Sequence, residues 1–419
     1  MTADRGFALR DHVLDPILLN ERALATIIAG TKWTRGNQMP ALRDDIDPDG
    51  LLEYSVVFSD RSLNSMSDAF GDVMRDISRI MRNAYGAASL AVVPGGGTYG
   101  MEAIARQFVN DANVLVIRNG WFSFRWSQII EAGGLAKQTT VMAARQLEDS
   151  TDASFAPCPL DEITARIRAE KPDVVFCPHV ETSAGMMVPD DFIAAVAGAV
   201  HEHGGLFVLD CVASGTVFVN LEETGVDVLL TAPQKGWSAS PCAALVMMSP
   251  HARARLDNTT SSSFANDLKK WTQIMETYES GAHAYHATMP TDALRHFRDA
   301  LLEAEGFGLE ALKQAQIRLG EQVRDLMGRH SYKSVAADGF QAPSVVVCFA
   351  PNAEMKSGKA FAEQGLQIAA GVPLECGERE DYASFRIGLF GLDKLENPER
   401  TVAHLETALE QIRGQNMPS

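Results

Sequence analysis

The chain carries the stretch VVPGGGTYG at residues 92–100, where a short apolar run meets three consecutive glycines and then a helix-like segment. The apolar run has the composition of a buried strand, and the residues after the glycines have helical spacing. Backbone N–H groups at a glycine-rich turn can surround an anion, and a helix N-terminus adds a favourable dipole. The stretch therefore predicts a strand–turn–helix unit in which Gly96, Gly97 and the hydroxyl of Thr98 form an anion-binding turn. A glycine-rich turn without a ligand is the alternative.

Apolar runs alternate with helix-like segments up to about residue 250, and this alternation predicts a mostly parallel sheet with helices on both faces. Several runs are continuously apolar, as expected where both faces of a sheet are covered. The predicted strands are Ser89–Val93, Asn113–Arg118, Gln138–Met142, Asp173–Cys177, Gly205–Asp210, Asp227–Leu230 and Ala243–Met248. The predicted helices between them include Tyr99–Val109, Leu160–Ala169 and Asp190–His203.

The pattern changes after about residue 290, which predicts a second, smaller α+β domain. The elements expected there are one long helix within Thr291–Leu326, strands Ser344–Cys348 and Ser384–Leu389, and a terminal helix Pro398–Arg413. The expected division is an N-terminal arm over residues 1–55, a large domain over 56–290 and a small C-terminal domain over 291–419.

Composition excludes several classes of function. The 419 residues carry a formal net charge of −17, which argues against a nucleic-acid or anionic-membrane partner. No apolar run approaches the length of a membrane helix, and the first residues lack the layout of a signal peptide. The six cysteines contain no CxxC pair, so reduced thiols and a cytoplasmic location are expected. No metal site is predicted, because His201 and His203 point to different sides of one helix.

Two ionisable residues follow predicted strands further along the chain. Asp210 ends a very apolar strand, at the sheet edge where open α/β folds bind ligands. A buried carboxylate there needs a partner such as a protonated ring nitrogen, although a helix N-cap role is also possible. Lys235 follows the next apolar run; burial would lower its pKa, as a Schiff-base lysine requires. Taken alone, Lys235 could equally be a surface lysine.

The three features occur in the order that a pyridoxal phosphate site requires. The glycine-rich turn would take the phosphate, Asp210 the ring nitrogen, and Lys235 the aldehyde. An NADP-dependent oxidoreductase is the alternative from another class, because the turn also matches GxGxxG and Arg118 ends the next strand. That alternative leaves Asp210 and Lys235 without a role.

The order and the residues of these motifs resemble those of the class V aminotransferases of fold type I, in the alanine–glyoxylate/serine–pyruvate branch. The resemblance runs from about Asn64 to Gly391. The motifs that carry it are PGGGTYGMEA at 94–103, HVETSAG at 179–185, DCVAS at 210–214, QK at 234–235, YHAT at 285–288 and RIG at 386–388.

The resemblance implies a fold type I pyridoxal-phosphate-dependent transferase, with a mostly parallel central sheet and a smaller C-terminal α+β domain. It also implies a homodimer with the site at the subunit interface. The resemblance implies that Lys235 forms the Schiff base, that Asp210 pairs with the pyridinium nitrogen, and that Arg386 binds the substrate α-carboxylate. The residues it implies for ring contacts are Phe122 (with Trp121 as the competitor), Val212 and Ser183. Those it implies for the phosphate are Gly96, Gly97, Thr98 and Gln234, with Tyr285 and Thr288 reaching the phosphate of the neighbouring subunit.

The function expected from this is transamination of a small α-amino acid with a small 2-keto acid, with glyoxylate or pyruvate as the expected acceptor. Other pyridoxal phosphate chemistry, of the lyase or desulfurase type, is the closer alternative. A desulfurase needs a mobile, activated cysteine, and Cys376 lies in a loop-like stretch, yet no neighbouring residue marks it as activated.

Overall fold

The computed structural model describes residues 45–415 of the chain. Residues 1–44, which make up most of the predicted N-terminal arm, and residues 416–419 lie outside the described part. Within the described part, no helix combines the length and the apolar character that crossing a lipid bilayer requires.

A seven-stranded sheet dominates the first half of the described chain, with strand order β1-β11-β10-β9-β6-β2-β3. All neighbouring pairs are parallel except those of β11, which is antiparallel to both β1 and β10. The seven strands predicted from sequence are these seven, with ends that differ by one residue or none. Their bounds are β1 Ser89–Pro94, β2 Asn113–Arg118, β3 Gln138–Ala143, β6 Val174–Pro178, β9 Leu206–Asp210, β10 Val228–Thr231 and β11 Ala243–Met248.

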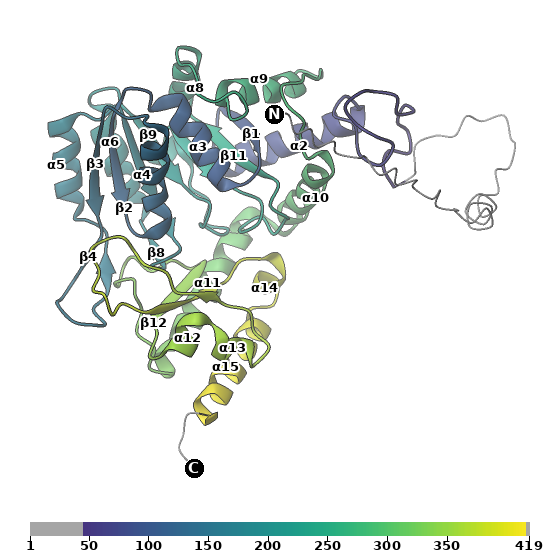
Figure 1. Cartoon of the computed structure of the whole chain (residues 1–419). Coiled ribbons are helices and arrows are strands. Elements are labelled where there is room, and N and C mark those ends of the chain that lie inside the picture. Colours follow the sequence, from purple (N-terminus) through teal and green to yellow (C-terminus); the bar gives the residue numbers. More distant parts are fainter. Residues whose placement is uncertain (1–44, 416–419) are drawn as a thin grey trace, which may run out of the picture. The chain divides into compact units, whose positions relative to one another are not determined.

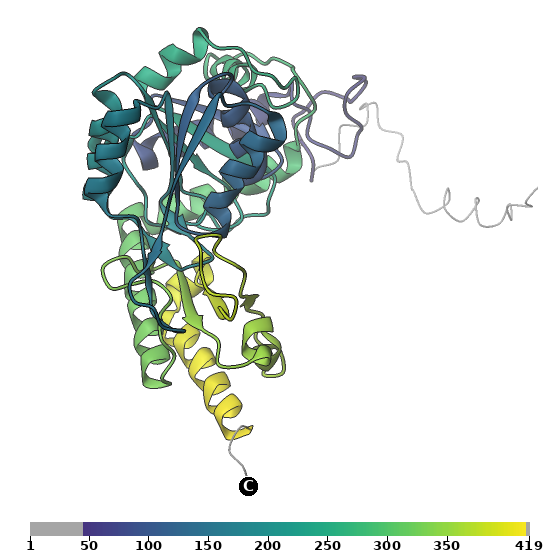
Figure 2. The same cartoon turned by 60° about the vertical axis from the view of Figure 1, so that its left-hand side comes forward.

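Helices cover this sheet on both sides (Figures 1 and 2). On one side α3 packs on β10 and β11 and α4 packs on β2 and β6, while on the other α6 packs on β9 and α5 packs on α6. Buried, continuously apolar strands such as β9 (LFVLD) are what this two-sided cover requires. The helices are α2 Asp68–Tyr85, α3 Gly97–Phe108, α4 Trp121–Gly133, α5 Leu160–Glu170, α6 Asp190–His201, α7 Leu221–Thr224, α8 Pro250–Asp257 and α9 Leu268–Glu279.

Helix α2 is not among the elements singled out by the sequence patterns. Its N-terminus is capped by Ser67, whose hydroxyl accepts a hydrogen bond from the Phe70 N–H at 3.1 Å. Its C-terminus is closed by Gly86 in the left-handed conformation, with φ of 61°. One face of α2 is fully buried and packs against α9 and α10.

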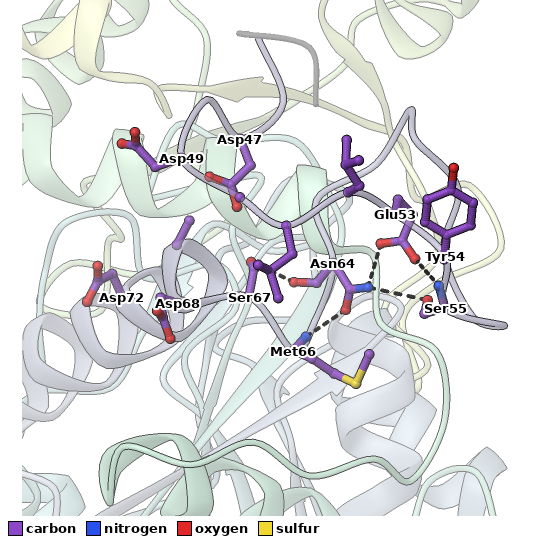
Figure 3. Close-up of a pocket in the computed structure, with 14 residues that line it drawn as sticks. Asp47, Asp49, Glu53, Tyr54, Ser55, Asn64, Met66, Ser67, Asp68 and Asp72 are labelled. Atoms are coloured by element: carbon purple, nitrogen blue, oxygen red, sulfur yellow. Dashed lines mark hydrogen bonds between the residues drawn. The ribbon is translucent and has the colours of Figure 1, made fainter. Parts of the chain in front are cut away.

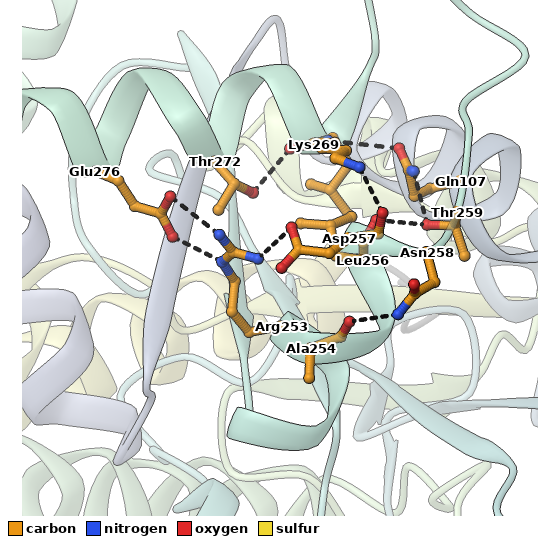
Figure 4. Close-up of polar contacts among 11 residues, drawn as sticks. Gln107, Arg253, Ala254, Leu256, Asp257, Asn258, Thr259, Lys269, Thr272 and Glu276 are labelled. Carbon is orange, nitrogen blue, oxygen red and sulfur yellow. Dashed lines mark hydrogen bonds and ion pairs between the residues drawn. The ribbon is translucent and has the colours of Figure 1, made fainter.

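A polar network fixes helix α8 against α9 and α3 (Figure 4). The Arg253 guanidinium bonds both carboxylate oxygens of Glu276 at 2.7 and 3.1 Å, and it pairs with Asp257 at 2.8 Å. These two carboxylates raise the pKa of Arg253 above its ordinary value. Gln107 of α3 reaches the Thr259 hydroxyl at 2.9 Å. Such bidentate arginine pairs hold two helices in a defined geometry.

The second sheet has three strands in the order β12-β14-β13, with bounds Val345–Phe349, Ser384–Gly388 and Ala369–Ala370. Beside it are helices α10 Thr291–Phe307, α11 Leu309–Arg329, α12 Ala353–Ser357, α13 Lys359–Ala362, α14 Leu392–Glu396 and α15 Pro398–Gln415. Short strand pairs complete the fold: β4 Arg145–Gln146 with β5 Phe155–Ala156, and β7 Val180–Glu181 with β8 Met186–Met187.

Two expectations about helices need correction. The segment Thr291–Leu326 was expected to be one long helix, but it is broken at Gly308, which has φ of 98° and caps α10 before α11 begins. A residue with a side chain would resist that backbone conformation. The helix predicted to reach His203 ends at His201. The next residues form a turn, in which the Gly205 N–H donates to the Val200 carbonyl at 3.2 Å.

Candidate active site

A cavity of about 230 Å³ lies where the predicted site residues converge. Asp210 is the last residue of β9, and Lys235 lies just beyond the end of β10. Parallel strands end at the same sheet edge, which explains why residues far apart in sequence meet there. The cavity is lined by Gly97, Thr98, Met101, Phe122, Ser123, Arg125, Pro178, Val180, Thr182, Asp210, Val212, Ala213, Gln234 and Lys235.

The glycine-rich turn begins helix α3 at one end of the cavity. Gly96 is the residue before the helix, and its backbone is extended. A Cβ on Gly97 would come within 3.0 Å of a Val212 methyl, so the glycine allows α3 to approach the strand that carries Asp210. The first turn of a helix has backbone N–H groups without helical partners. The turn therefore offers an anion both donors and a favourable dipole.

Arg125 brings a permanent positive charge to this turn. Its guanidinium donates to the Thr98 hydroxyl at 2.9 Å, and it lies 5.3 Å from the centre of the Phe122 ring. Sequence reasoning missed this residue. The available signal was its spacing, because Arg125 follows Phe122 by three positions in a helix and so lies on the same face.

Asp210 is 9% exposed, and one of its carboxylate oxygens accepts the Val212 N–H at 3.0 Å. Burial raises the pKa of Asp210 to about 6, against the opposing effects of the Val212 hydrogen bond and the Lys235 charge. A cationic group that binds beside a buried carboxyl group stabilises its ionised form.

Lys235 is half-buried at the same cavity. Burial lowers the pKa of its amine, while the carboxylates of Asp210 and Glu181 act in the opposite direction. The amine lies 5.7 Å from the centre of the Phe122 ring and 5.6 Å from that of Phe390. A lysine with a lowered pKa is a better nucleophile toward an aldehyde at neutral pH.

Phe122, rather than Trp121, faces the cavity. The Phe122 ring is near Lys235, Arg125 and the guanidinium of Arg386, which lies 5.5 Å from its centre. The Trp121 ring contacts Phe124 instead, with their centres 6.0 Å apart.

Glu181 fixes the start of helix α4 and thereby the Phe122 backbone. Its fully buried carboxylate accepts the N–H groups of Phe122 and Ser123 at 3.2 and 2.8 Å. It also accepts the hydroxyls of Ser123 and Ser183, both at 2.7 Å, and the Ser183 hydroxyl in turn accepts the Trp121 N–H at 3.0 Å. Glu181 lies within the quoted HVETSAG motif, but its role as a helix cap was not foreseen.

His179 is buried beside the same strand ends. Its Nδ1 lies 2.7 Å from the Ser214 hydroxyl, and its backbone N–H donates to the Asp210 carbonyl at 2.9 Å. Burial lowers the pKa of His179 to about 3. The imidazole is therefore neutral at neutral pH and adds no charge to the site.

Arg386 reaches the Phe122 ring, which lines the cavity, from the second sheet. It lies on β14, where its Nε donates to the Ala370 carbonyl at 2.8 Å, and burial lowers its pKa. The contact between Arg386 and the Phe122 ring therefore joins residues from two separate sheets.

Tyr285 and Thr288 do not line this cavity. Tyr285 is 61% exposed, and its hydroxyl lies 3.2 Å from that of Thr288. The structure brings these two residues to each other and not to Lys235 of the same chain.

A larger cavity, of about 650 Å³, lies at residues 47–72 and differs in chemistry (Figure 3). Its charged lining residues are all acidic: Asp47, Asp49, Glu53, Asp68 and Asp72. Glu53 is already bonded to the Ser55 N–H and the Asn64 amide, both at 2.6 Å. This cavity offers a phosphate or carboxylate no positive charge, whereas the cavity at Lys235 is lined by Lys235 and Arg125 and suits an anion.

The cavity at Lys235 fits pyridoxal phosphate on four counts. The glycine-rich turn and Arg125 suit a phosphate, and buried Asp210 suits a protonated ring nitrogen. Phe122 offers an aromatic face, and Lys235 is the amine that an aldehyde requires.

Comparisons with known proteins agree with this fit. No family model matches the chain. Alanine–glyoxylate aminotransferase 1 of Saccharomyces cerevisiae is 29% identical over 266 residues, which are 59% of this chain and 66% of the yeast enzyme, just under two thirds of its length. A 2-aminoethylphosphonate–pyruvate transaminase of Burkholderia ambifaria is 28% identical over 78% of this chain and 84% of its own. A Synechococcus protein named soluble hydrogenase, small subunit, is 26% identical over 77% of this chain and 80% of its own length.

Among solved structures, the alanine–glyoxylate aminotransferase of a Nostoc species superposes with a TM-score of 0.71 at 23% identity, covering 84% of this chain and 89% of that one. At this identity the superposition establishes the fold, which is that of the fold type I pyridoxal-phosphate-dependent transferases. In sequence and in fold, the chain is therefore similar to the pyridoxal-phosphate-dependent aminotransferases of class V.

Proposed function

We propose that the chain transfers an amino group between a small α-amino acid and a small 2-keto acid, with glyoxylate or pyruvate as the acceptor. The observation that carries this proposal is that Lys235, Asp210 and Phe122 line one cavity, while Arg386 lies over the same Phe122 ring as Lys235. The relatives named for alanine–glyoxylate and 2-aminoethylphosphonate–pyruvate transamination support both keto acids as candidates.

Residues in and around the cavity would hold the cofactor at four places: its phosphate, its ring, its ring nitrogen and its aldehyde carbon. Gly96, Gly97, Thr98 and Gln234 would hold the phosphate, and we add Arg125 to this set because of its bond to Thr98. Phe122 and Val212 would contact the two faces of the ring, and Ser183 would bond at the ring. Asp210 would pair with the ring nitrogen, and Lys235 would be the Schiff-base lysine.

When bound, the cofactor supplies an electron sink for the carbanion formed at the substrate Cα. Asp210 holds a proton at the ring nitrogen, because a buried carboxylate favours the charged form of a neighbouring cation. The Lys235 amine would act as the base and acid that moves the substrate Cα proton. Arg386 binds the α-carboxylate with its planar, two-pronged donor set and so orients Cα toward Lys235.

We also propose that the enzyme is a homodimer. Tyr285 and Thr288 are exposed and paired with each other, which leaves them accessible to the phosphate site of a second subunit. The two separate sheets support the division into a large domain over 56–290 and a small domain over 291–419, after an arm over 1–55. The six free cysteines support a cytoplasmic location.

The geometry favours transamination over the two alternatives. Burial raises the pKa of the Cys376 thiol to about 12, and the thiol bonds backbone carbonyls, so it is poorly suited to desulfurase chemistry. The Arg118 guanidinium is engaged with Ser127 and the Glu375 carbonyl and lies over the Phe124 ring, so it is not directed to a nucleotide 2′-phosphate.

The visible absorption spectrum of the purified protein, before and after addition of alanine, serine, glycine or aspartate, tests the proposal. We expect a band of lysine-bound pyridoxal phosphate that converts to the pyridoxamine form with at least one amino acid. A band that persists with every amino acid would overturn the transamination proposal but not the cofactor assignment. No band after supplying pyridoxal phosphate would overturn both.

Phe122→Ala is expected to weaken cofactor binding about two- to tenfold, because a stacked aromatic pair contributes about 0.5–1.5 kcal/mol. Trp121→Ala is the matched control: its ring points to Phe124, and its backbone N–H still donates to Ser183. The dissociation constant of pyridoxal phosphate, measured by fluorescence titration of cofactor-free protein, checks the difference. An equal loss in both variants would contradict the assignment of Phe122.

Asp210→Asn is expected to stabilise the cofactor-free protein at pH 7.5 by about 2–3 kcal/mol while lowering kcat about 10²–10³-fold. The pKa of Asp210 is raised from 3.8 to about 6 in the folded protein, so folded protein binds the proton more tightly than unfolded protein does. The wild type therefore loses stability as pH rises from about 4 to about 6, and asparagine does not.

Urea unfolding of both cofactor-free proteins at pH 4 and pH 7.5 measures this effect. The difference between them should shrink toward zero at pH 4. Asp338→Asn is the control for an exposed carboxylate and should change stability at neither pH. A loss of stability in Asp210→Asn that is equal at both pH values would contradict the prediction.

A further inference from the structure

Two histidines and one aspartate meet near the point where β10 begins, whereas Lys235 lies beyond the other end of the same strand. His201 ends α6, Asp227 immediately precedes β10, and His251 lies in the first turn of α8. One ligand atom from each lies within 4.8 Å of the other two. The cluster takes no part in the proposed transamination.

The Asp227 carboxylate is held in place independently of the histidines. It is 2% exposed; one oxygen accepts the Phe207 N–H at 2.9 Å, and the other accepts the Ser249 hydroxyl at 3.2 Å. A carboxylate has about four acceptor positions, so two remain after these bonds. Orientation of a ligand by such outer partners is characteristic of protein metal sites.

The two histidine side chains occupy those remaining positions and face solvent. His201 Nε2 lies 2.9 Å from one carboxylate oxygen, and His251 Nδ1 lies 3.1 Å from the other, with side chains 39% and 49% exposed. Tetrahedral ligands at zinc distances stand roughly 3.3 Å apart. Each histidine–aspartate distance is close to this value, but the two run to different carboxylate oxygens, so a shared ion requires one exposed imidazole to rotate toward the oxygen that the other contacts.

We propose that His201, Asp227 and His251 form a binding site for a divalent cation of the zinc type, with water in the open position. Two imidazoles and one carboxylate are a donor set that zinc accepts. Helix α8 is anchored through Arg253 and Glu276, so the His251 backbone is fixed relative to the sheet. The bound cation would link the end of α6, the start of β10 and the start of α8, and so stabilise the fold away from the catalytic cavity.

Titration calorimetry of the holoenzyme with Zn²⁺ alone, in a buffer without chelators, tests the proposal. We expect one equivalent to bind, with a dissociation constant that rises at least tenfold in both His201→Ala and His251→Ala. His203→Ala is the matched control: it removes a histidine two positions along, whose Nε2 bonds the Pro172 carbonyl instead, and it should bind as the wild type does. Zn²⁺ should also raise the Tm of wild type and His203→Ala but not of the other two variants.

Two results would overturn the proposal. One is the absence of Zn²⁺ binding to the wild type up to about 1 mM, which would show that the cluster is a hydrogen-bonded clamp between the three elements. The other is wild-type affinity in either His201→Ala or His251→Ala, which would place the bound ion elsewhere. Neither result bears on transamination, because the cluster and the cavity share no residue.

Discussion

Lys235→Ala is expected to abolish turnover, with kcat/KM falling by more than about 10⁴-fold. The variant loses both the amine that binds the cofactor's aldehyde and the base that moves the Cα proton, and the proton transfer alone contributes about 10²–10⁴-fold. The residue is placed for both tasks, because its amine has a lowered pKa, lies at the Phe122 ring and shares a cavity with Asp210. Steady-state transamination and the visible spectrum of protein supplied with pyridoxal phosphate measure the two losses separately.

Lys394→Ala is the matched control for this variant. The Lys394 amine donates to the Phe390 carbonyl at 2.8 Å, so it is a neighbouring lysine that contacts the same aromatic residue from another side. We expect it to keep kcat within about threefold of the wild type. Added methylamine should restore part of the activity of Lys235→Ala, because a free amine can take up the Cα proton. Turnover in Lys235→Ala without an added amine would contradict the assigned role.

Arg386→Ala is expected to raise KM for both the amino acid and the keto acid and to lower kcat/KM by about 30- to 4000-fold. This range corresponds to the 2–5 kcal/mol lost when one partner of a buried charge pair is removed. Burial already lowers the pKa of Arg386, so a carboxylate bound beside it would be shielded from water. Initial-rate kinetics over a range of both substrates measure the effect.

Arg386→Lys should fall between Arg386→Ala and the wild type, because it keeps the charge but loses the planar pair of donors. Arg379→Ala is the control, since that arginine is exposed and pairs with Asp381 and Asp149 at the surface. The cofactor absorption band should be unchanged in all three variants, which separates substrate binding from folding. Unchanged KM values in Arg386→Ala would show that another group binds the carboxylate.

Strand prediction succeeded because it depends on local sequence. A strand buried on both faces must be apolar along its whole length, so runs such as 206–210 are visible without knowledge of their neighbours. The order of the glycine-rich turn, Asp210 and Lys235 is equally readable, because each follows a recognisable strand. The break at Gly308 was missed because the apolar spacing is helical on both sides of it.

Contacts between separate elements could not be read in this way. The cap that Glu181 provides to α4 depends on how β7 meets the start of a helix about 60 residues earlier in the chain. The Arg125–Thr98 bond depends on the packing of α4 against α3, and the choice of Phe122 over Trp121 depends on the rotation of α4 about its axis. None of these leaves a periodic signal in the sequence.

The sequence by itself determined the class of fold and predicted that Asp210 and Lys235 follow neighbouring strands, which is where the structure brings them to one cavity. These follow from hydrophobic periodicity and from residue types that are unfavourable to bury without a partner. Only the tertiary structure decided that Arg386 reaches the Phe122 ring from a second sheet and that Arg125 joins the glycine turn; it alone also brought His201, Asp227 and His251 together, away from the cavity. The physical reason is that charge interactions act across space between elements whose relative positions are set by packing, and no local pattern encodes those positions.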